Sequence, residues 1–216
     1  QALLGKVYLF QEKFAEAADV LEEVITSGRY ELVDEYGQIF EAQGENGPEA
    51  VFEVQYSDAE GAGFGCLQCS EGNIAVGFNG IRNYAGPVFD GGFSFNVPVQ
   101  EAYDAFEVGD SRRDVSILDI EAWAAETGAT YGIGYEHTGY YNRKYIARKG
   151  DNNLGDQNLT NPNNYRAIRY ADVLLMAAEA LNRGGIDDER ARTYLNQVRR
   201  RAFGDLDHDI SASGAA

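Results

Sequence analysis

The chain has 216 residues, enough for one domain or one large fragment with a real hydrophobic core. Acidic side chains number 35 against 18 basic ones, so the formal net charge is −17, which argues against nucleic acid or an anionic membrane surface as a partner. Hydrophobic residues make up 44% and aromatic residues 12% of the chain, too much for a disordered protein, so we expect a folded one.

Both ends of the chain are expected to be cut from a longer protein. Residues 1–10 (QALLGKVYLF) begin inside an apolar helical pattern with no capping side chain before it, and residues 204–216 form a polar tail. The sequence contains no run of about 20 apolar residues and no signal peptide. We therefore expect any export signal to lie in the missing part.

Two helices are predicted in the first thirty residues. Residues 1–10 carry one apolar face, and residues 14–27 carry a second, which ends at Gly28. The residues that fit the spacing of a tetratricopeptide hairpin are Leu4, Gly5, Tyr8, Phe14 and Ala17. The pair is predicted to pack closely, because small residues let two helices approach while aromatic rings fill the groove.

The middle of the chain has little helical periodicity. One helix is predicted near residues 98–107, with Pro98 in its first turn. Its buried edge would consist of Ala102, Tyr103 and Phe106. The predicted strands are residues 50–56, 115–120 and 140–147. Residues 57–97 mix Gly and Asn with Phe and Tyr, which indicates a convoluted loop that packs on its own side chains.

A second helical hairpin is predicted near the C-terminal end. Its helices span residues 165–182 and 187–202, with a stop at Gly184 and Gly185. Neither hairpin can bury its apolar stripe alone, so we expect the two to pack against each other although they are far apart in sequence.

The predicted division of the chain is 1–30 for the first hairpin, 31–163 for an irregular ligand-binding lobe, 164–203 for the second hairpin and 204–216 for the tail. The expected fold class is mainly α, with tetratricopeptide-like helical hairpins and a loop-rich lobe that contains a few short β-strands.

Cys66 and Cys69 form the only CxxC motif, and four interpretations of it stay open. A local disulfide in an oxidising compartment is preferred, ahead of two free thiols, a metal half-site and thioredoxin-like redox chemistry. Two cysteines cannot complete a zinc site, which needs four ligands. Redox chemistry needs a strand before the motif and a helix after it, whereas Gly65 and Ser70 flank this pair.

Other chemistry-bearing residues favour ordinary structural roles. His137 lies in a loop, where an imidazole that hydrogen-bonds its surroundings is the commoner case. The many carboxylates indicate a solvated acidic surface rather than a glycosidase pair. Residues 151–164 offer oxygen ligands for calcium, but Gly155 and Asp156 occupy positions where an EF-hand needs a ligand and a glycine, respectively, so a polar turn is favoured. We expect no enzyme activity, no cofactor and no metal.

The aromatic loop is the better candidate for a binding site. Its rings are Phe64, Phe78, Tyr84, Phe89, Phe93 and Phe95, and its polar side chains include Asn73, Asn79, Arg82 and Asn83. Flat rings stack on the apolar face of a sugar while amides and guanidinium groups reach its hydroxyls. Packing inside the loop is the alternative for any single ring. The predicted ligand-binding residues are Phe78, Asn79, Arg82, Asn83, Tyr84 and Phe93.

Four segments carry a family resemblance. They are the helix pair at 2–32, the strand VFEVQY at 51–56, the stretch FNVPVQEAYDAFE followed by GDSRRD within 95–114, and residues 165–202 with IRYADVLL and LNQVRRRA. In this order they resemble the SusD/RagB family of Bacteroidetes outer-membrane lipoproteins over nearly the whole chain. The helix that contains IRYADVLL is the most specific element. The chain would correspond to the central to C-terminal part of a family member.

This resemblance implies a tetratricopeptide-like scaffold with a glycan-binding face, held by a lipid anchor on the extracellular face of the outer membrane. It also implies a partner, a SusC-like TonB-dependent transporter over which the protein acts as a lid. The implied function is non-catalytic capture of oligo- or polysaccharides for delivery to that transporter. The alternative is a scaffold that binds peptides or a protein partner, since RagB-like members are associated with peptides. Family binding residues have no fixed motif that maps onto this chain.

Overall fold

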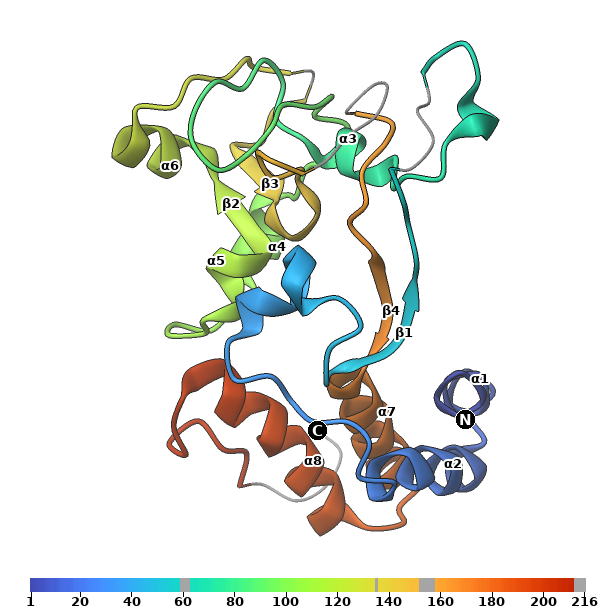
Figure 1. Ribbon diagram of the computed structural model, residues 1–216. Coiled ribbons are helices and arrows are strands. Elements are labelled where there is room, and N and C mark those ends of the chain that lie inside the picture. Colours follow the sequence, from blue (N-terminus) through green and yellow to red (C-terminus); the bar gives the residue numbers. More distant parts are fainter. Residues whose placement is uncertain (59–62, 135, 152–157, 212–216) are drawn as a thin grey trace. The chain divides into compact units, whose positions relative to one another are not determined.

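The computed structural model describes residues 1–58, 63–134, 136–151 and 158–211 (Figure 1). The helices in these ranges are α1 (Ala2–Phe10), α2 (Phe14–Thr26), α3 (Ala75–Asn79), α4 (Gln100–Asp104), α5 (Arg112–Ser116), α6 (Ile120–Thr127), α7 (Tyr170–Arg183) and α8 (Asp188–Phe203). The strands are β1 (Ala50–Val54), β2 (Ile117–Asp119), β3 (Tyr140–Asn142) and β4 (Tyr165–Arg169). The predicted class, mainly helical with a few short strands, is confirmed. No helix within the described ranges is long and apolar enough to cross a membrane.

The chain folds into two compact units. The helical unit contains residues 1–39, 43–53 and the chain from Arg166 onward. The lobe contains residues 40–42 and the chain between Val54 and Tyr165. Most of residues 31–53, which the sequence analysis assigned to the lobe, therefore belong to the helical unit.

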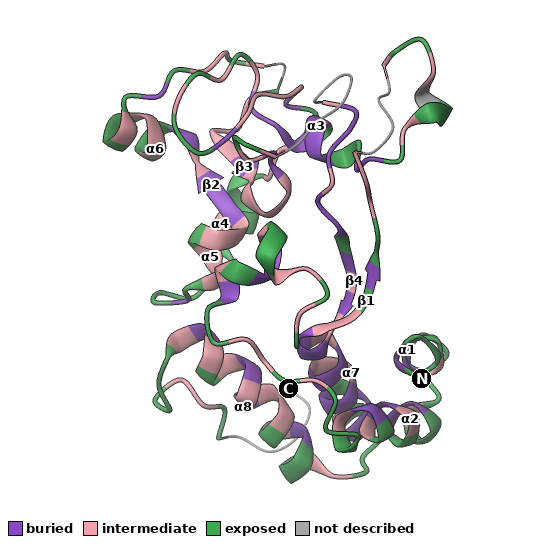
Figure 2. Cartoon of the chain, viewed as in Figure 1, coloured by how far each residue is buried: buried purple, intermediate pink, exposed green. Residues whose placement is uncertain are grey.

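The helical unit is built around one apolar core that draws on α1, α2, α7 and α8. Its most completely buried members are Ala17, Leu21, Val173, Leu174, Ala177 and Ala180, each 0% exposed. The 3.6-residue apolar stripes of α2 and α7 explain this burial, because each stripe would otherwise face water. Residues from both ends of the chain thus share one core, and the buried positions on α2 and α7 are purple in Figure 2.

α1 and α2 approach closely at Gly5, as the tetratricopeptide spacing predicted. A Cβ atom at this position would lie 2.5 Å from Leu21 Cγ, closer than real side-chain contacts, so the approach requires glycine. Gly28 follows α2 with a φ of 63°, a left-handed conformation that glycine adopts without strain.

The second hairpin begins later than predicted. Tyr165–Arg169 form β4, which pairs with β1 in a two-stranded sheet, and α7 starts at Tyr170. The helix predicted over 165–182 was therefore wrong in its first five residues. Burial alternates along β4, a period that fits a strand, and Asp172 Oδ2 accepts a hydrogen bond from the Arg169 backbone N–H at 2.8 Å, which marks the first turn of the helix.

The lobe has a smaller core around its own short sheet. β2 and β3 pair antiparallel, with Leu118 opposite Tyr141. The buried core residues are Ile81, Phe89, Leu118, Ile120, Tyr141 and Ile146. Both strands are shorter than predicted, because residues 115–116 belong to α5 and residues 143–145 form a 3-10 turn.

The helix predicted at residues 98–107 is also shorter, since α4 covers only its middle. Pro98 lies two residues before the helix rather than in its first turn. Ala102, which was assigned to the buried edge, is exposed, whereas the two aromatic residues of that edge are half-buried. A five-residue helix is too short to present a continuous apolar stripe, which is why the predicted edge does not form.

Candidate ligand-binding site

Four phenylalanines of the lobe form a cluster that we name the phenylalanine patch: Phe64, Phe78, Phe93 and Phe95. The Phe93 ring lies at its centre, with centroids 6.4 Å from Phe64, 6.1 Å from Phe78 and 5.6 Å from Phe95. Phe64 and Phe95 are 69% and 68% exposed, and Phe78 is 37% exposed. Large contiguous apolar patches on a protein surface often mark interaction or ligand-binding sites.

Backbone contacts place two parts of the patch side by side. The Phe93 N–H donates to the Gly77 carbonyl at 2.9 Å, and the Phe95 N–H donates to the Phe78 carbonyl at 2.9 Å, so residues 93–95 run along α3. Gly80 and Gly92 allow this approach, because a Cβ atom on Gly92 would lie 2.4 Å from the Gly80 Cα. The rings that the sequence placed in one long loop are thus brought together by glycines.

Ser94, which lies between Phe93 and Phe95 in the sequence, turns inward. Its side chain is buried, and its hydroxyl accepts a hydrogen bond from the Arg82 backbone N–H at 2.9 Å. The same hydroxyl lies 3.2 Å from the Tyr141 hydroxyl in the lobe core. The patch therefore rests on a backbone that is hydrogen-bonded to the core.

Arg82 is the cationic side chain of the patch. Its Nη2 donates to the Phe93 carbonyl at 2.7 Å, and its guanidinium carbon lies 5.9 Å from the centroid of the Phe95 ring. Arg82 thus supports the backbone between the rings and places positive charge beside them.

The two predicted asparagines differ in accessibility. Asn79 is 4% exposed, and its amide is occupied, since its Oδ1 accepts from Asn96 Nδ2 at 2.8 Å and its Nδ2 donates to the Tyr145 carbonyl at 3.5 Å. Asn83 is exposed at a turn with a φ of 49°. Of the two amides, that of Asn83 is open to a ligand.

Tyr84 lies outside the phenylalanine patch and contacts other residues of the lobe. Its hydroxyl donates to the Pro87 carbonyl at 2.6 Å and accepts from Trp123 Nε1 at 2.9 Å. Its ring meets Phe89 edge to face, with centroids 6.3 Å apart. The structure therefore divides the predicted residues into Phe78, Phe93 and Arg82 at the patch and Tyr84 against the lobe core.

Trp123 on α6 is an aromatic residue that the sequence analysis did not select, although it is the only tryptophan of the chain. It lines a pocket of about 220 Å³ together with Tyr103, Arg113, Asp119 and Arg143, among others. Burial lowers the pKa of the Arg143 guanidinium, and the charge of the nearby Arg148 adds to this effect.

Both rings of this pocket already have an aromatic and a cationic neighbour. The centroid of the Tyr103 ring lies 4.7 Å from that of Tyr140 and 4.8 Å from the Arg113 guanidinium carbon. The Trp123 ring has Phe89 at 5.5 Å and the Arg143 guanidinium at 5.7 Å. The pocket thus offers charged groups more than free ring faces, and the phenylalanine patch is better suited to stacking.

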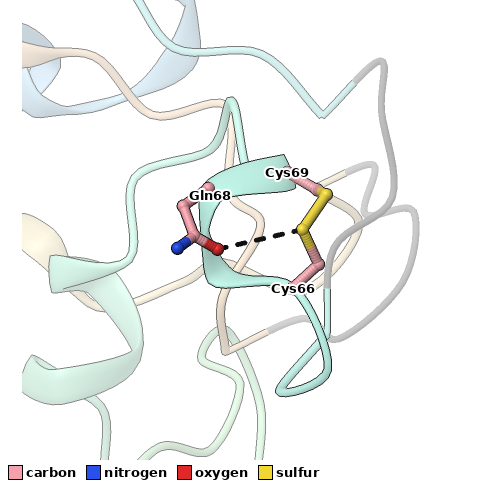
Figure 3. The surroundings of a disulfide bond; sticks show 3 residues. All are labelled: Cys66, Gln68 and Cys69. Atoms are coloured by element: carbon pink, nitrogen blue, oxygen red, sulfur yellow. Dashed lines mark hydrogen bonds between the residues drawn. A yellow bond between two sulfur atoms is a disulfide. The ribbon is translucent and has the colours of Figure 1, made fainter.

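Cys66 and Cys69 are joined by a disulfide, with Cα atoms 5.4 Å apart (Figure 3). Of the four interpretations of the CxxC motif, the structure has the local disulfide. Gln68 Oε1 lies 4.0 Å from Cys66 Sγ inside the same turn.

The residues considered for other chemistry are engaged in packing or turns. His137 packs between the rings of Tyr131 and Tyr141, at 5.8 and 6.2 Å. Asp151 Oδ2 accepts from the Arg148 N–H at 3.0 Å, and residues 152–157 of the segment considered for calcium lie outside the described residues. Among the residues that the structure describes, no group of three or more His, Cys, Asp or Glu side chains could hold a metal ion.

Comparison with known proteins gives a consistent set of relatives. Residues 118–210 match the SusD family. A curated relative, SusD-like protein P2 of Formosa agariphila, is 31% identical over 217 residues, which cover 93% of this chain and 40% of the relative.

Solved structures resemble the chain over almost its whole length. Surface glycan-binding protein A from Bacteroides fluxus has a TM-score of 0.86 and 33% identity, covering 98% of this chain and 45% of that protein. A laminarin-binding SusD-like protein has a TM-score of 0.82 and 37% identity, covering 93% of this chain and 46% of that protein. The chain spans less than half the length of these relatives.

Proposed function

Because this chain belongs to the SusD family, we propose that it is the glycan-capturing part of a longer, non-catalytic protein of the cell surface. The names of the similar proteins support this proposal, since one is a surface glycan-binding protein and another binds laminarin. The observation in this chain that carries it is the phenylalanine patch, a set of clustered rings in which the backbones of Phe93 and Phe95 are hydrogen-bonded to α3.

Capture would rest on ring stacking. The C–H face of a sugar packs on an aromatic ring, and polar groups at the edge reach its hydroxyls. Phe78, Phe93 and Phe95 supply the rings, and Arg82 places its guanidinium beside them. We assign the exposed amide of Asn83, the residue that follows Arg82, to the same site. Such contacts are non-covalent and reversible, which suits a protein that hands its cargo on.

We assign the first candidate ligand to the laminarin class, because the laminarin-binding relative shares 37% identity with this chain. A neutral glucan also fits the charge of the chain, since a net charge of −17 repels anionic polysaccharides.

The partner and location proposed here come from the family. The full-length protein would be anchored by lipid on the extracellular face of the outer membrane and would deliver its glycan to a SusC-like TonB-dependent transporter. Capture of peptides, the alternative, has less support, because two of the relatives named above are named for glycan or laminarin binding.

A glycan array run beside a peptide library on the purified chain tests the proposal. We expect binding to neutral glucans, laminarin among them, and no enrichment of peptides. Product analysis after long incubation with the bound glycan should recover it intact. Peptide binding without glycan binding would contradict the proposed function, and shortened glycan would contradict its non-catalytic part.

A further inference from the structure

Phe64 is the most exposed ring of the phenylalanine patch. It was one of the aromatic residues of the loop, but it was not among the predicted ligand-binding residues. Its ring is tilted by 59° against that of Phe93, with the two centroids 6.4 Å apart, and 69% of the residue is exposed. A ring in this position can contact a ligand at low entropic cost only if the backbone that carries it is already ordered.

The segment that carries Phe64 is firmly attached on its C-terminal side. Ser70 Oγ donates to the Leu159 carbonyl at 2.7 Å. Gly72 packs so closely that a Cβ atom there would lie 2.5 Å from the Asn161 nitrogen. Residues 70–72 therefore form an anchor on the rest of the lobe.

In the sequence, the Cys66–Cys69 disulfide lies between Phe64 and this anchor. The Cys69 N–H donates to the Cys66 carbonyl at 3.2 Å, and the Cys66 N–H donates to the Gly63 carbonyl at 3.0 Å. These two hydrogen bonds and the disulfide connect the anchor to Gly63, the residue before Phe64, and the disulfide is the covalent one of the three connections. A Cβ atom on Gly65 would have no neighbour within 4 Å, so the backbone between Phe64 and Cys66 faces open space on that side.

We propose that Phe64 contacts the ligand and that the Cys66–Cys69 disulfide positions it at the patch before the ligand arrives. This inference deepens the proposed glycan capture and rests on it. A disulfide that closes so short a loop adds little to the free energy of unfolding, because it restricts the unfolded chain far less than a long loop does. The disulfide instead acts on the binding free energy, because a segment that is ordered in advance loses less conformational entropy when the ligand binds.

A double-mutant cycle by isothermal titration calorimetry, with laminarin as the probe, tests the proposal. Phe64→Ala should weaken binding about tenfold, as expected for the loss of one stacking ring. The variant Cys66→Ser with Cys69→Ser should weaken it roughly two- to tenfold. The variant with all three changes should bind no more weakly than Phe64→Ala alone, because a ring that is absent cannot be positioned.

Phe95→Ala is the matched control. Phe95 belongs to the same patch but is carried by the segment along α3, so its effect should add to that of disulfide removal. The melting temperature should stay close to that of the wild type in the disulfide-free variant. Unchanged affinity without the disulfide, or losses that add fully to those of Phe64→Ala, would overturn the positioning role.

An NMR measurement separates failure of this inference from failure of the proposed function. We expect a nuclear Overhauser effect between the ring protons of Phe64 and Phe93 in the oxidised protein, and its loss when the disulfide is removed. A persistent effect would overturn the positioning role whatever the protein binds. A wild-type protein that binds neither laminarin nor any glycan on the array would instead overturn the ligand contact and the proposed function together.

Discussion

The two groups of predicted residues can be told apart by comparing Phe95→Ala with Tyr84→Ala. Phe95 has its ring largely in solvent at the patch, whereas Tyr84 packs against Phe89 and hydrogen-bonds Trp123. Truncating Phe95 should therefore weaken glycan binding and leave the fold intact. Truncating Tyr84 should lower stability and affect binding only through the fold.

The sizes of these effects follow from burial. Phe95 is 68% exposed, so about a third of a full ring burial is lost, roughly 0.5–1 kcal/mol of unfolding free energy. Loss of one stacking ring should weaken binding by about 1–3 kcal/mol, by analogy with rings that stack on nucleobases. Tyr84→Ala removes two hydrogen bonds and a half-buried ring, so we expect about 2–4 kcal/mol less stability.

Urea unfolding and isothermal titration calorimetry on both variants measure these quantities. The calorimetric titrations use the glycan that binds the wild-type protein most tightly on the array. If Phe95→Ala binds as well as the wild type while Tyr84→Ala binds more weakly at unchanged stability, the stacking platform lies at Tyr84 and the assignment of the patch is refuted.

Three further outcomes are expected. Leu21→Ala, at a fully buried position beside Gly5, should destabilise the helical unit by about 2–5 kcal/mol in urea unfolding, and a loss under 1 kcal/mol would contradict its place in the core. The backbone N–H of Arg190 donates to the Asp187 carboxylate and holds its pKa below the usual aspartate value of about 4, so this stabilisation is complete at neutral pH and is lost as pH falls through the lowered pKa. Asp187→Asn keeps a capping side chain without the titrating group, so its free energy of unfolding should depend less on acid pH than that of the wild type. Equal acid sensitivity of the two proteins would contradict this role. Affinity for a neutral glucan should be unchanged between low and high salt, whereas a steep loss with salt would indicate ion pairs with the ligand.

The helices could be predicted where their apolar period runs for several turns. α2 and α8 appear within two residues of the predicted bounds, because their stripes are long and α2 is followed by Gly28. β4 was misread as helix, because its five residues run into the helical stripe of α7 and pairing with β1 decides their conformation. The short helices α3, α5 and α6 of the lobe were missed, since so few residues show no reliable period and tertiary contacts stabilise them.

The candidate site could be predicted in kind but not in detail. Composition indicates an aromatic loop, and the structure collects three of its rings around Phe93. The contact between Gly80 and Gly92 decides which rings meet. These two glycines are twelve positions apart and have no side chains, so the sequence shows no pattern that would pair them. The buried amide of Asn79 is a similar case, because its partners at Asn96 and Tyr145 are distant in sequence.

Exposed rings and strong acidity are connected in this chain. A patch of phenylalanines favours ligand binding, but it also favours contact between copies of the protein, because apolar surface leaves water in either case. A net charge of −17 opposes such self-association through repulsion between copies, while a neutral sugar experiences no such repulsion. Acidity therefore discriminates between the two kinds of contact that the same rings could make. The physical requirement on the lobe is then a rigid backbone beneath the rings, and the hydrogen bonds of Phe93, Ser94 and Phe95 provide it.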